Sequence, residues 1–261
     1  MKEQAKKREQ APESACMAEG KNAVMELLRS GNPVDKVFVA EDMADGRTHA
    51  ILSLARERGA VTVRCSRRKL DGMSQTGAHQ GMIAFGAPKA YVSLEDILET
   101  ARQRGEAPLL VLCDGMTDPH NLGAVIRSAE TAGAHGIVLP KRRSATLNEA
   151  AVKASAGAVA HMAVARVPNL AMAIEELKER GVWIFGADAG GDRTLYNADF
   201  KGAAAIVIGS EGNGLSRIVR EKCDFIVSIP MKGSINSLNA SAAAAVLLYE
   251  AVRQRMEASY E

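Results

Sequence analysis

Hydrophobic residues follow two different spacings along most of the chain. Continuous apolar runs stand at 108–113 and 203–208, a pattern typical of strands buried on both faces of a parallel sheet. Between such runs, apolar side chains recur three or four residues apart, as in Asn169–Arg180, which indicates amphipathic helices. Strands that alternate with helices at this interval predict an α/β fold, in which helices cover both faces of a parallel sheet. The expected strands are 34–40, 59–64, 81–85, 108–113, 136–139, 162–166, 182–187, 203–208 and 225–229, and the expected helices are 20–30, 48–58, 67–73, 94–102, 122–132, 148–156, 169–180 and 240–253.

The alternation falls into two predicted domains. Residues 18–86 form a small α/β unit, and residues 108–261 carry the longer series of strands and helices. The stretch 87–107 mixes proline, charged residues and one short helix, and we interpret it as a linker. Residues 1–17 have almost no large apolar side chains, so we expect a disordered tail there.

Composition narrows the class of protein. With 261 residues and 47% hydrophobic content, the chain can bury one large core or two smaller ones, and Trp183 is expected in a core. The apolar runs are far shorter than about 20 residues, and the N-terminus lacks the apolar stretch of a signal peptide. We therefore expect a cytoplasmic protein without a membrane span. The four cysteines lie far apart with no Cys-x-x-Cys pair, which indicates reduced thiols and no metal site.

Charge is distributed unevenly around a net value of +2. Residues 1–90 hold 15 Lys and Arg against 11 Asp and Glu, a net +4, and the remaining residues hold 18 against 20, a net −2. Basic clusters at 64–69 and 141–143 could meet phosphates. Such clusters are more often solvated surface, so charge alone does not establish nucleic-acid binding.

Three polar loops follow predicted strands, at the sheet edge where parallel α/β proteins bind ligands. The first, 114–121, places Asn121 at a helix N-cap and leads to Arg127, which either faces inward toward an anion or a ribose hydroxyl or is a surface side chain. The second, Ile208–Leu215, has three glycines that let the backbone approach a ligand. The third, 228–241, crosses from a strand to an alanine-rich helix through serines and asparagines suited to a polar ligand.

The second loop also excludes some ligands. Its glycine order is G-x-x-G-x-G, which is neither the G-x-G-x-x-G of a dinucleotide fold nor a phosphate-binding loop. This order counts against NAD and against nucleotide hydrolysis. Glu211 inside the loop would repel a phosphate and suits a cationic or hydroxyl-bearing ligand.

Taken together, the segments Asn121–Arg127, Ile208–Leu215 and Ile229–Ser241 resemble the three motifs of the SpoU (TrmH) family. These proteins are S-adenosyl-L-methionine (AdoMet)-dependent RNA ribose 2′-O-methyltransferases of the SPOUT superfamily. The likeness covers about residues 108–256. Residues 20–24, 79–84 and 114–121 are similar to the RlmB branch, which has a small L30e-like RNA-binding domain and methylates a guanosine of 23S rRNA.

The resemblance implies a fold, a cofactor and a set of site residues. The sheet would end in a trefoil knot that includes 228–241, a rare exception to unknotted topology, and the protein would be a homodimer packed through the knotted domain. The implied catalytic residues are Arg127, Asn121, Glu211, Ser237 and Asn239, and the implied AdoMet-binding residues are Gly209, Ile229, Leu238, Ser210, Gly214 and Met231. Arg127 matches the residue assigned to proton removal. Because a guanidinium is normally never deprotonated, it could instead stabilise the alkoxide or grip a phosphate.

We therefore expect an enzyme that methylates a ribose 2′-hydroxyl of RNA, with a guanosine of 23S rRNA as the first candidate. The same chemistry on tRNA or another rRNA site is the alternative within the class. A non-catalytic RNA-binding factor for ribosome assembly and a small-molecule dehydrogenase are the candidates outside it.

Overall fold

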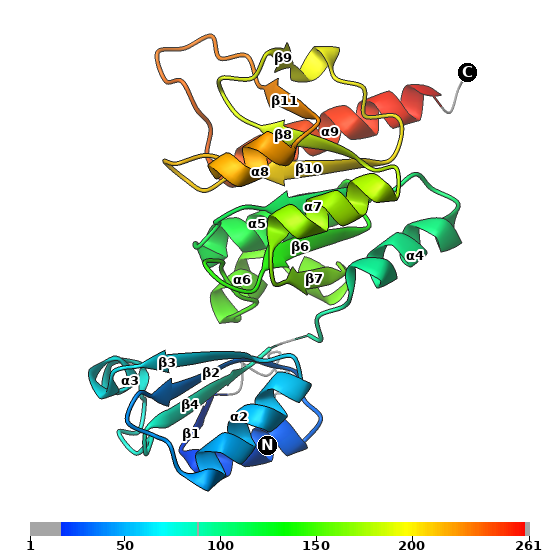
Figure 1. The fold of residues 1–261 in the computed structure, drawn as a ribbon. Helices are drawn as coiled ribbons and strands as arrows, with labels where there is room; N and C mark the ends of the chain where they lie inside the picture. The colour runs from blue at the N-terminus through cyan, green and yellow to red at the C-terminus, as the bar shows by residue number, and fades with distance from the viewer. Residues whose placement is uncertain (1–16, 88, 259–261) are drawn as a thin grey trace, which may run out of the picture. The chain divides into compact units, whose positions relative to one another are not determined.

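The computed structural model describes residues 17–87 and 89–258, and the chain divides into two compact units, Met1–Ala90 and Tyr91–Glu261 (Figure 1). Each unit has its own sheet; the first unit has one hydrophobic core, and the second has two, one on each face of its sheet. Of the tail predicted at 1–17, residues 1–16 lie outside the described residues. Met17 begins a strand, so the predicted boundary is wrong by one residue.

The first unit is a small sheet that packs against helices. Its strands are β1 (Met17–Glu19), β2 (Val34–Ala40), β3 (Val61–Cys65) and β4 (Met82–Gly86), and its helices are α1 (Lys21–Arg29), α2 (Gly46–Glu57) and α3 (Arg67–Met73). The strand order is β1-β4-β2-β3, with β2 and β3 parallel and the other pairs antiparallel. Leu28, Ile51 and Leu70, one from each helix, are fully buried in its core. The short strand β1 was not predicted, because three residues carry too little pattern.

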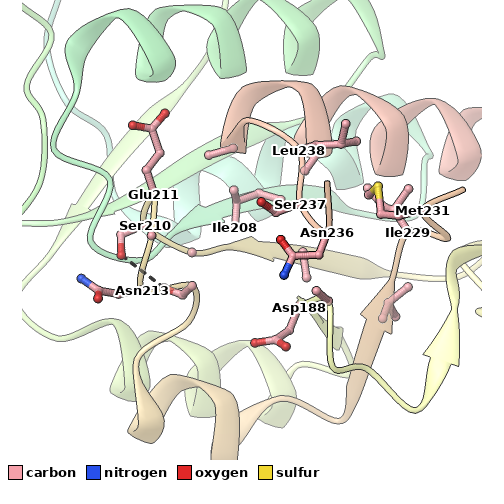
Figure 2. A pocket seen from close by; sticks show the side chains of 18 residues that line it. Asp188, Ile208, Ser210, Glu211, Asn213, Ile229, Met231, Asn236, Ser237 and Leu238 are labelled. Atoms are coloured by element: carbon pink, nitrogen blue, oxygen red, sulfur yellow. Dashed lines mark hydrogen bonds between the residues drawn. The ribbon is translucent and has the colours of Figure 1, made fainter. Parts of the chain in front are cut away.

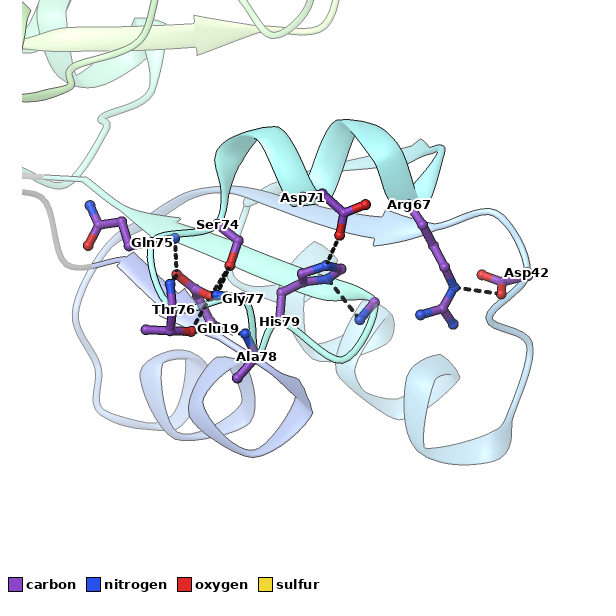
Figure 3. A network of polar contacts seen from close by, with 11 residues as sticks. Glu19, Asp42, Arg67, Asp71, Ser74, Gln75, Thr76, Gly77, Ala78 and His79 are labelled. Atoms are coloured by element: carbon purple, nitrogen blue, oxygen red, sulfur yellow. Dashed lines mark hydrogen bonds and ion pairs between the residues drawn. The ribbon is translucent and has the colours of Figure 1, made fainter.

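Glu19, at the end of β1, holds a loop of the first unit in place (Figure 3). Its carboxylate accepts hydrogen bonds from the hydroxyls of Ser74 and Thr76, at 2.5 and 2.6 Å, and from the backbone amide of Gln75 at 2.7 Å. These donors favour the ionised carboxylate and lower the pKa of Glu19 to about 2. One side chain of the first strand thus fixes the loop that follows α3.

The second unit is a seven-stranded sheet with helices on both faces. Its strands are β5 (Leu109–Cys113), β6 (Gly136–Pro140), β7 (Val164–Val167), β8 (Trp183–Ala187), β9 (Arg193–Thr194), β10 (Ala204–Ile208) and β11 (Phe225–Ser228), and its helices are α4 (Leu94–Arg104), α5 (Pro119–Thr131), α6 (Glu149–Ala154), α7 (Leu170–Glu179), α8 (Arg217–Lys222) and α9 (Ala240–Ala258). The strand order is β7-β6-β5-β10-β8-β11-β9, and every pair is parallel.

Alternate residues of the central strands serve two separate cores. In β5, Leu109, Val111 and Cys113 face the core that α5 and α9 cover, and Leu110 and Leu112 face the core that α4, α7 and α8 cover. A strand buried on both faces needs apolar residues at every position, which explains the continuous runs in the sequence. The predicted parallel α/β fold is confirmed. The helix α8 and the strand β9 were not predicted.

The predicted linker, 87–107, is wrong for its larger part, because α4 belongs to the second unit. Leu94, Ile97 and Ala101 of α4 are buried against the sheet. A Cβ at Gly136 would lie 2.5 Å from the Cδ1 atom of Ile97, so this glycine makes room for the helix. Ser93 and Asp96 form a capping box at its N-terminus.

Two further predictions for the second unit are wrong. Trp183 is not in the core: 54% of its surface is exposed, because it is the first residue of β8 and its ring lies against Phe225 at the sheet's margin. Asn121 is not an N-cap: α5 begins at Pro119, and Asp118 caps it by accepting from the backbone amide of His120. The trefoil knot stays a prediction. No helix in the described part of the chain is long and apolar enough to cross a membrane.

Replacing Glu19 with Gln removes the charge that orders the loop at 74–79. We expect amide exchange of Gln75 and Thr76 at pH 7 to become about five- to tenfold faster, because hydrogen bonds to an ionised carboxylate are stronger than hydrogen bonds to a neutral amide. The depressed pKa means that the wild-type stabilisation is present above the unfolded pKa, near 4.5, and is lost as the pH falls through about 2.

Hydrogen-exchange protection factors measured across this range check both statements. Wild type and Glu19→Gln should converge toward pH 2. Glu26→Gln, which changes an exposed carboxylate of α1, is the control. A difference between wild type and Glu19→Gln that stays constant with pH would contradict the assignment.

Candidate functional site

The three polar loops lie at the carboxyl edge of the central strands. β5 leads into the loop before α5, β10 into the loop before α8, and β11 into the loop before α9. Because β10 lies between β5 and β8, and β11 follows β8, parallel pairing brings segments far apart in sequence to one edge.

A cavity of about 390 Å³ opens between the second loop, the third loop and the end of β8 (Figure 2). All six predicted cofactor-binding residues line it, together with Glu211 and Ser237 of the predicted catalytic set. These six are Gly209, Ser210, Gly214, Ile229, Met231 and Leu238. Asn121, Asn239 and Arg127 do not line the cavity. Eight of the eleven predicted site residues thus line one cavity, and their roles in binding and catalysis stay predictions.

The wall formed by the second loop depends on its glycines. Ser210 and Gly214 exchange two backbone hydrogen bonds, both 2.9 Å long, so the loop closes on itself. A Cβ at Gly209 would lie 2.2 Å from the carbonyl carbon of Gly214, which is far inside van der Waals contact. Gly212 and Gly214 have φ angles of +83° and +64°, which L side chains rarely adopt. The glycines thus leave bare backbone in part of this wall, which a ligand can approach closely.

Glu211 joins the three loops. Its Oε1 atom accepts hydrogen bonds from the side-chain amides of Asn121, on α5, and Asn239, which precedes α9; the second is 3.0 Å long. Asn239 also donates to the Oδ1 atom of Asn121, at 3.0 Å. Each of the three polar segments contributes one member to this cluster, which we call the Asn–Glu–Asn cluster (Asn121, Glu211 and Asn239).

Asn239 has a second role at the start of α9. Its Oδ1 atom accepts from the backbone amides of Ser241 and Ala242, at 2.9 and 3.3 Å, and from the Ser241 hydroxyl at 2.6 Å. This is the N-cap interaction that satisfies free amides in the first turn of a helix. The side-chain nitrogen of Asn239 donates to Asn121 and Glu211, and its side-chain oxygen accepts from the first turn of α9. Asn239 therefore fixes where the third loop ends.

The rest of the third loop is held weakly. Residues 232–239 are all exposed, and within the described chain none of 229–238 makes a hydrogen bond. Ile229 and Met231 are partly buried, and Leu238 is 42% exposed while it lines the cavity. The loop is therefore anchored by strand β11 at one end and by Asn239 at the other.

Arg127 is an exposed side chain of α5, as in the surface interpretation of the sequence. Its guanidinium has no hydrogen bond or ion pair with the described residues, and its backbone carbonyl accepts a hydrogen bond from the hydroxyl of Thr131 at 3.0 Å. The buried positions of α5 are its neighbours, including Val125, Ile126 and Ala129. The cavity of one chain is therefore complete without Arg127.

Asp188, Asn213 and Asn236 also line the cavity and were missed. Asp188 directly follows β8, and its carboxylate accepts from the backbone amide of Gly190 at 2.8 Å and pairs with Arg220 at 2.8 Å. A signal for it existed, since a polar residue at the carboxyl end of a predicted parallel strand belongs to the ligand-binding edge. Asn236 lies in the third loop, directly before Ser237, which was among the predicted site residues.

The cavity's chemistry excludes several kinds of ligand. Its lining holds the carboxylates of Asp188 and Glu211 and no lysine or arginine, so it does not suit a phosphate. No group of metal-ligating side chains is found within the described residues. Burial raises the pKa of Cys113 and of Cys223 to about 12, so neither thiol is a ready nucleophile. A neutral or cationic ligand with polar and apolar parts fits best.

Comparison with known proteins places this site in a family. Residues 108–249 match the SpoU rRNA Methylase family, and residues 17–92 match the domain described as RNA 2′-O ribose methyltransferase substrate binding. A Bacillus subtilis (strain 168) protein, named as a member of the TrmH family of tRNA/rRNA methyltransferases, is 46% identical over 236 residues, which are 90% of this chain and 94% of that protein. A Staphylococcus aureus (strain MSSA476) protein named for the same family is 40% identical over 90% of this chain and 95% of its own length.

Solved structures agree with these matches. The SpoU methyltransferase AviRb from Streptomyces viridochromogenes, crystallised in complex with AdoMet, is 28% identical and has a TM-score of 0.60, covering 94% of this chain and 92% of AviRb. The TrmH/SpoU tRNA modifying enzyme of A. aeolicus is 28% identical with a TM-score of 0.54, covering 64% of this chain and 86% of that one. The fold, the cavity and both sequence matches lead to one conclusion: the chain belongs to the SpoU (TrmH) family of RNA methyltransferases.

Proposed function

We propose that this protein transfers a methyl group from AdoMet to a ribose 2′-hydroxyl of RNA, with a guanosine of 23S rRNA as the target. The observation that supports the proposal is the Asn–Glu–Asn cluster, which joins the three segments that resemble the family motifs and includes Glu211 of the cavity lining. The choice of a 23S guanosine rests on the likeness of residues 20–24, 79–84 and 114–121 to the branch with that activity.

The cavity fits AdoMet by its charge and by its walls. AdoMet carries a sulfonium cation, and the lining offers two carboxylates and no basic side chain. Gly209 and Gly214 let the backbone approach the cofactor, and Ile229, Met231 and Leu238 supply apolar contacts. When bound, AdoMet supplies a methyl group that its sulfonium charge already activates for transfer.

The protein must bring the 2′-hydroxyl into line with the methyl–sulfur bond, within about 3–3.5 Å of the methyl carbon, and assist the loss of its proton. Ser237 lines the cavity and can hold the ribose by its hydroxyl. Glu211 and Asn121 fix the loop geometry around the nucleotide. Because a guanidinium is normally never deprotonated, the part proposed for Arg127 is to stabilise the developing alkoxide or to hold the adjacent phosphate.

Arg127 requires a second subunit in this proposal, because it lies outside the cavity of its own chain. The helix α9, against which α5 packs, carries Val246, Tyr249 and Met256 on one side, each between 39% and 56% exposed. An apolar stripe of this kind on a soluble helix is typical of a subunit interface. We therefore propose a homodimer in which Arg127 completes the partner's site.

The proposal is tested by mass spectrometry of nucleosides from rRNA and tRNA of a strain lacking the protein, beside its parent. We expect one 2′-O-methylguanosine to disappear from 23S rRNA and to return with the wild-type gene. If a ribose methylation is lost from tRNA instead, the substrate is a tRNA and the reaction is still 2′-O-methylation. If no ribose methylation changes in any RNA, the protein is a non-catalytic assembly factor and the proposal fails.

Arg127→Ala should lower methyl transfer by about 10²–10³-fold, the usual loss when one transition-state donor is removed. AdoMet affinity should stay within about twofold, because Arg127 does not line the cavity. Single-turnover transfer and calorimetric AdoMet titration measure the two effects. Arg217→Ala serves as the control, because Arg217 is likewise exposed and, among the described residues, pairs only with Glu221 in its own helix. Near-normal turnover of Arg127→Ala would refute this role.

Gly209→Ala should weaken AdoMet binding at least about tenfold, because the added methyl group overlaps backbone that cannot move aside without opening the loop. Gly202→Ala adds the same group where nothing lies within 4 Å, so its AdoMet affinity should match wild type. Calorimetric titration of both variants checks the prediction, with circular dichroism to establish that each is folded. Equal affinities of the two variants would show that the close approach at Gly209 has no role.

A further inference from the structure

A second cavity, of about 570 Å³, lies at the same sheet edge. It opens between the ends of β5 and β6, the start of α7 and the loop before α8. It shares Ser210, Asn213 and Gly214 with the first cavity, so one loop forms a wall of both. A ligand here would therefore lie beside the proposed AdoMet site.

The charge of this second cavity is the opposite of the first. Arg142 and Arg143 line it, both are exposed, and neither has a hydrogen bond or ion pair with the described residues. Its lining holds one carboxylate, Asp114, which already accepts a hydrogen bond of 2.6 Å from the backbone amide of Ser216. Two guanidinium groups without a partner among the described residues, in a cavity whose one carboxylate already accepts a hydrogen bond, make a site for an anion.

The loop that carries the two arginines is fixed at both ends. The backbone amide of Lys141 donates to the carbonyl of Val167 at 2.8 Å, and the amide of Ala145 donates to the carbonyl of Met116 at 2.7 Å. Between these bonds, Arg143 has a φ of +54°, which a non-glycine residue adopts at an energetic cost. The two arginines therefore lie in a turn whose ends are held by backbone hydrogen bonds.

The N-terminus of α7 adds a favourable field. This helix has ten residues, and Asn169 caps it by accepting from the backbone amides of Ala171 and Met172. Its positive end borders the cavity through Asn169, Leu170 and Ala171. The partial positive charge at the N-terminus of α7 adds to the attraction of the two arginines for an anion.

We propose that this second cavity binds the phosphate backbone of the RNA next to the nucleotide that is methylated, through Arg142 and Arg143. The inference rests on the proposed function and assigns a subsite to its substrate. The cavity is far larger than one phosphate, as a polynucleotide requires, and its wall is shared with the cavity that would hold the methyl donor.

The test is equilibrium binding of the full-length protein to an unmodified in vitro transcript of 23S rRNA, across a range of NaCl concentrations. The variants are Arg142→Ala and Arg143→Gly, the second of which removes the side chain while suiting the positive φ. Arg217→Ala, on the neighbouring helix α8 but outside the cavity lining, is the matched loss of one positive charge.

We expect each cavity variant to raise the Kd for RNA about tenfold and to reduce the slope of log Kd against log salt by roughly 0.7–0.9, the release of about one counterion. Arg217→Ala should change the Kd by no more than about twofold. The Kd for AdoMet should be the same in all proteins. RNA binding does not depend on catalysis. The measurement therefore tests whether the two arginines bind RNA phosphates even if the wild type methylates no RNA and the proposed function fails.

Two results would overturn the inference. RNA affinity and salt slope equal to those of Arg217→Ala would mean that the arginines are ordinary surface. A parallel loss of AdoMet affinity in Arg142→Ala and Arg143→Gly would mean that they support the shared loop rather than bind RNA.

Discussion

Three loops that are far apart in sequence meet on the carboxylate of Glu211. Asn121 and Asn239 both donate to it, and each lies at the start of a long helix. The helices α5 and α9 pack against one face of the sheet, so the carboxylate relates the positions of both helices to the glycine loop. The walls of the 390 Å³ cavity are defined relative to one another through this contact. A charged acceptor shared by two amides is well suited to this task, because hydrogen bonds to an ionised group are stronger than neutral ones.

The parallel sheet explains why polar groups collect at one edge. All seven strands run in the same direction, so every strand-to-helix loop opens on the same side. The two cavities divide this edge by charge. One is lined by carboxylates and bare backbone and the other by two arginines, and only the turn at 210–214 separates them.

The sequence predicted much of this arrangement because its signals are local. Continuous apolar runs identified β5 and β10, and close-packed glycines identified the loop at Gly209. The start of α5 was misplaced although Asp118-Pro119 is itself a helix-start signal, since proline is favoured in the first turn. The helix α4 was assigned to a linker because its apolar residues, Leu94, Ile97 and Ala101, reveal no partner until the sheet is known. The exposure of Trp183 likewise depends on strand order, which no local pattern encodes, whereas Asp188 was missed although its place directly after a predicted strand was a local signal.

The exposed third loop has a thermodynamic consequence for any ligand of the first cavity. Between β11 and Asn239 it spans ten residues without hydrogen bonds to the described chain, so its conformational entropy is largely retained in the free protein. A ligand that contacts Met231, Ser237 and Leu238 must order this segment, and part of its interaction free energy offsets that loss. Affinity is therefore lower than the contacts alone would give, and the bound state dissociates more readily. For a site that must release its ligand after every turnover, a loosely held wall favours exchange over tight retention.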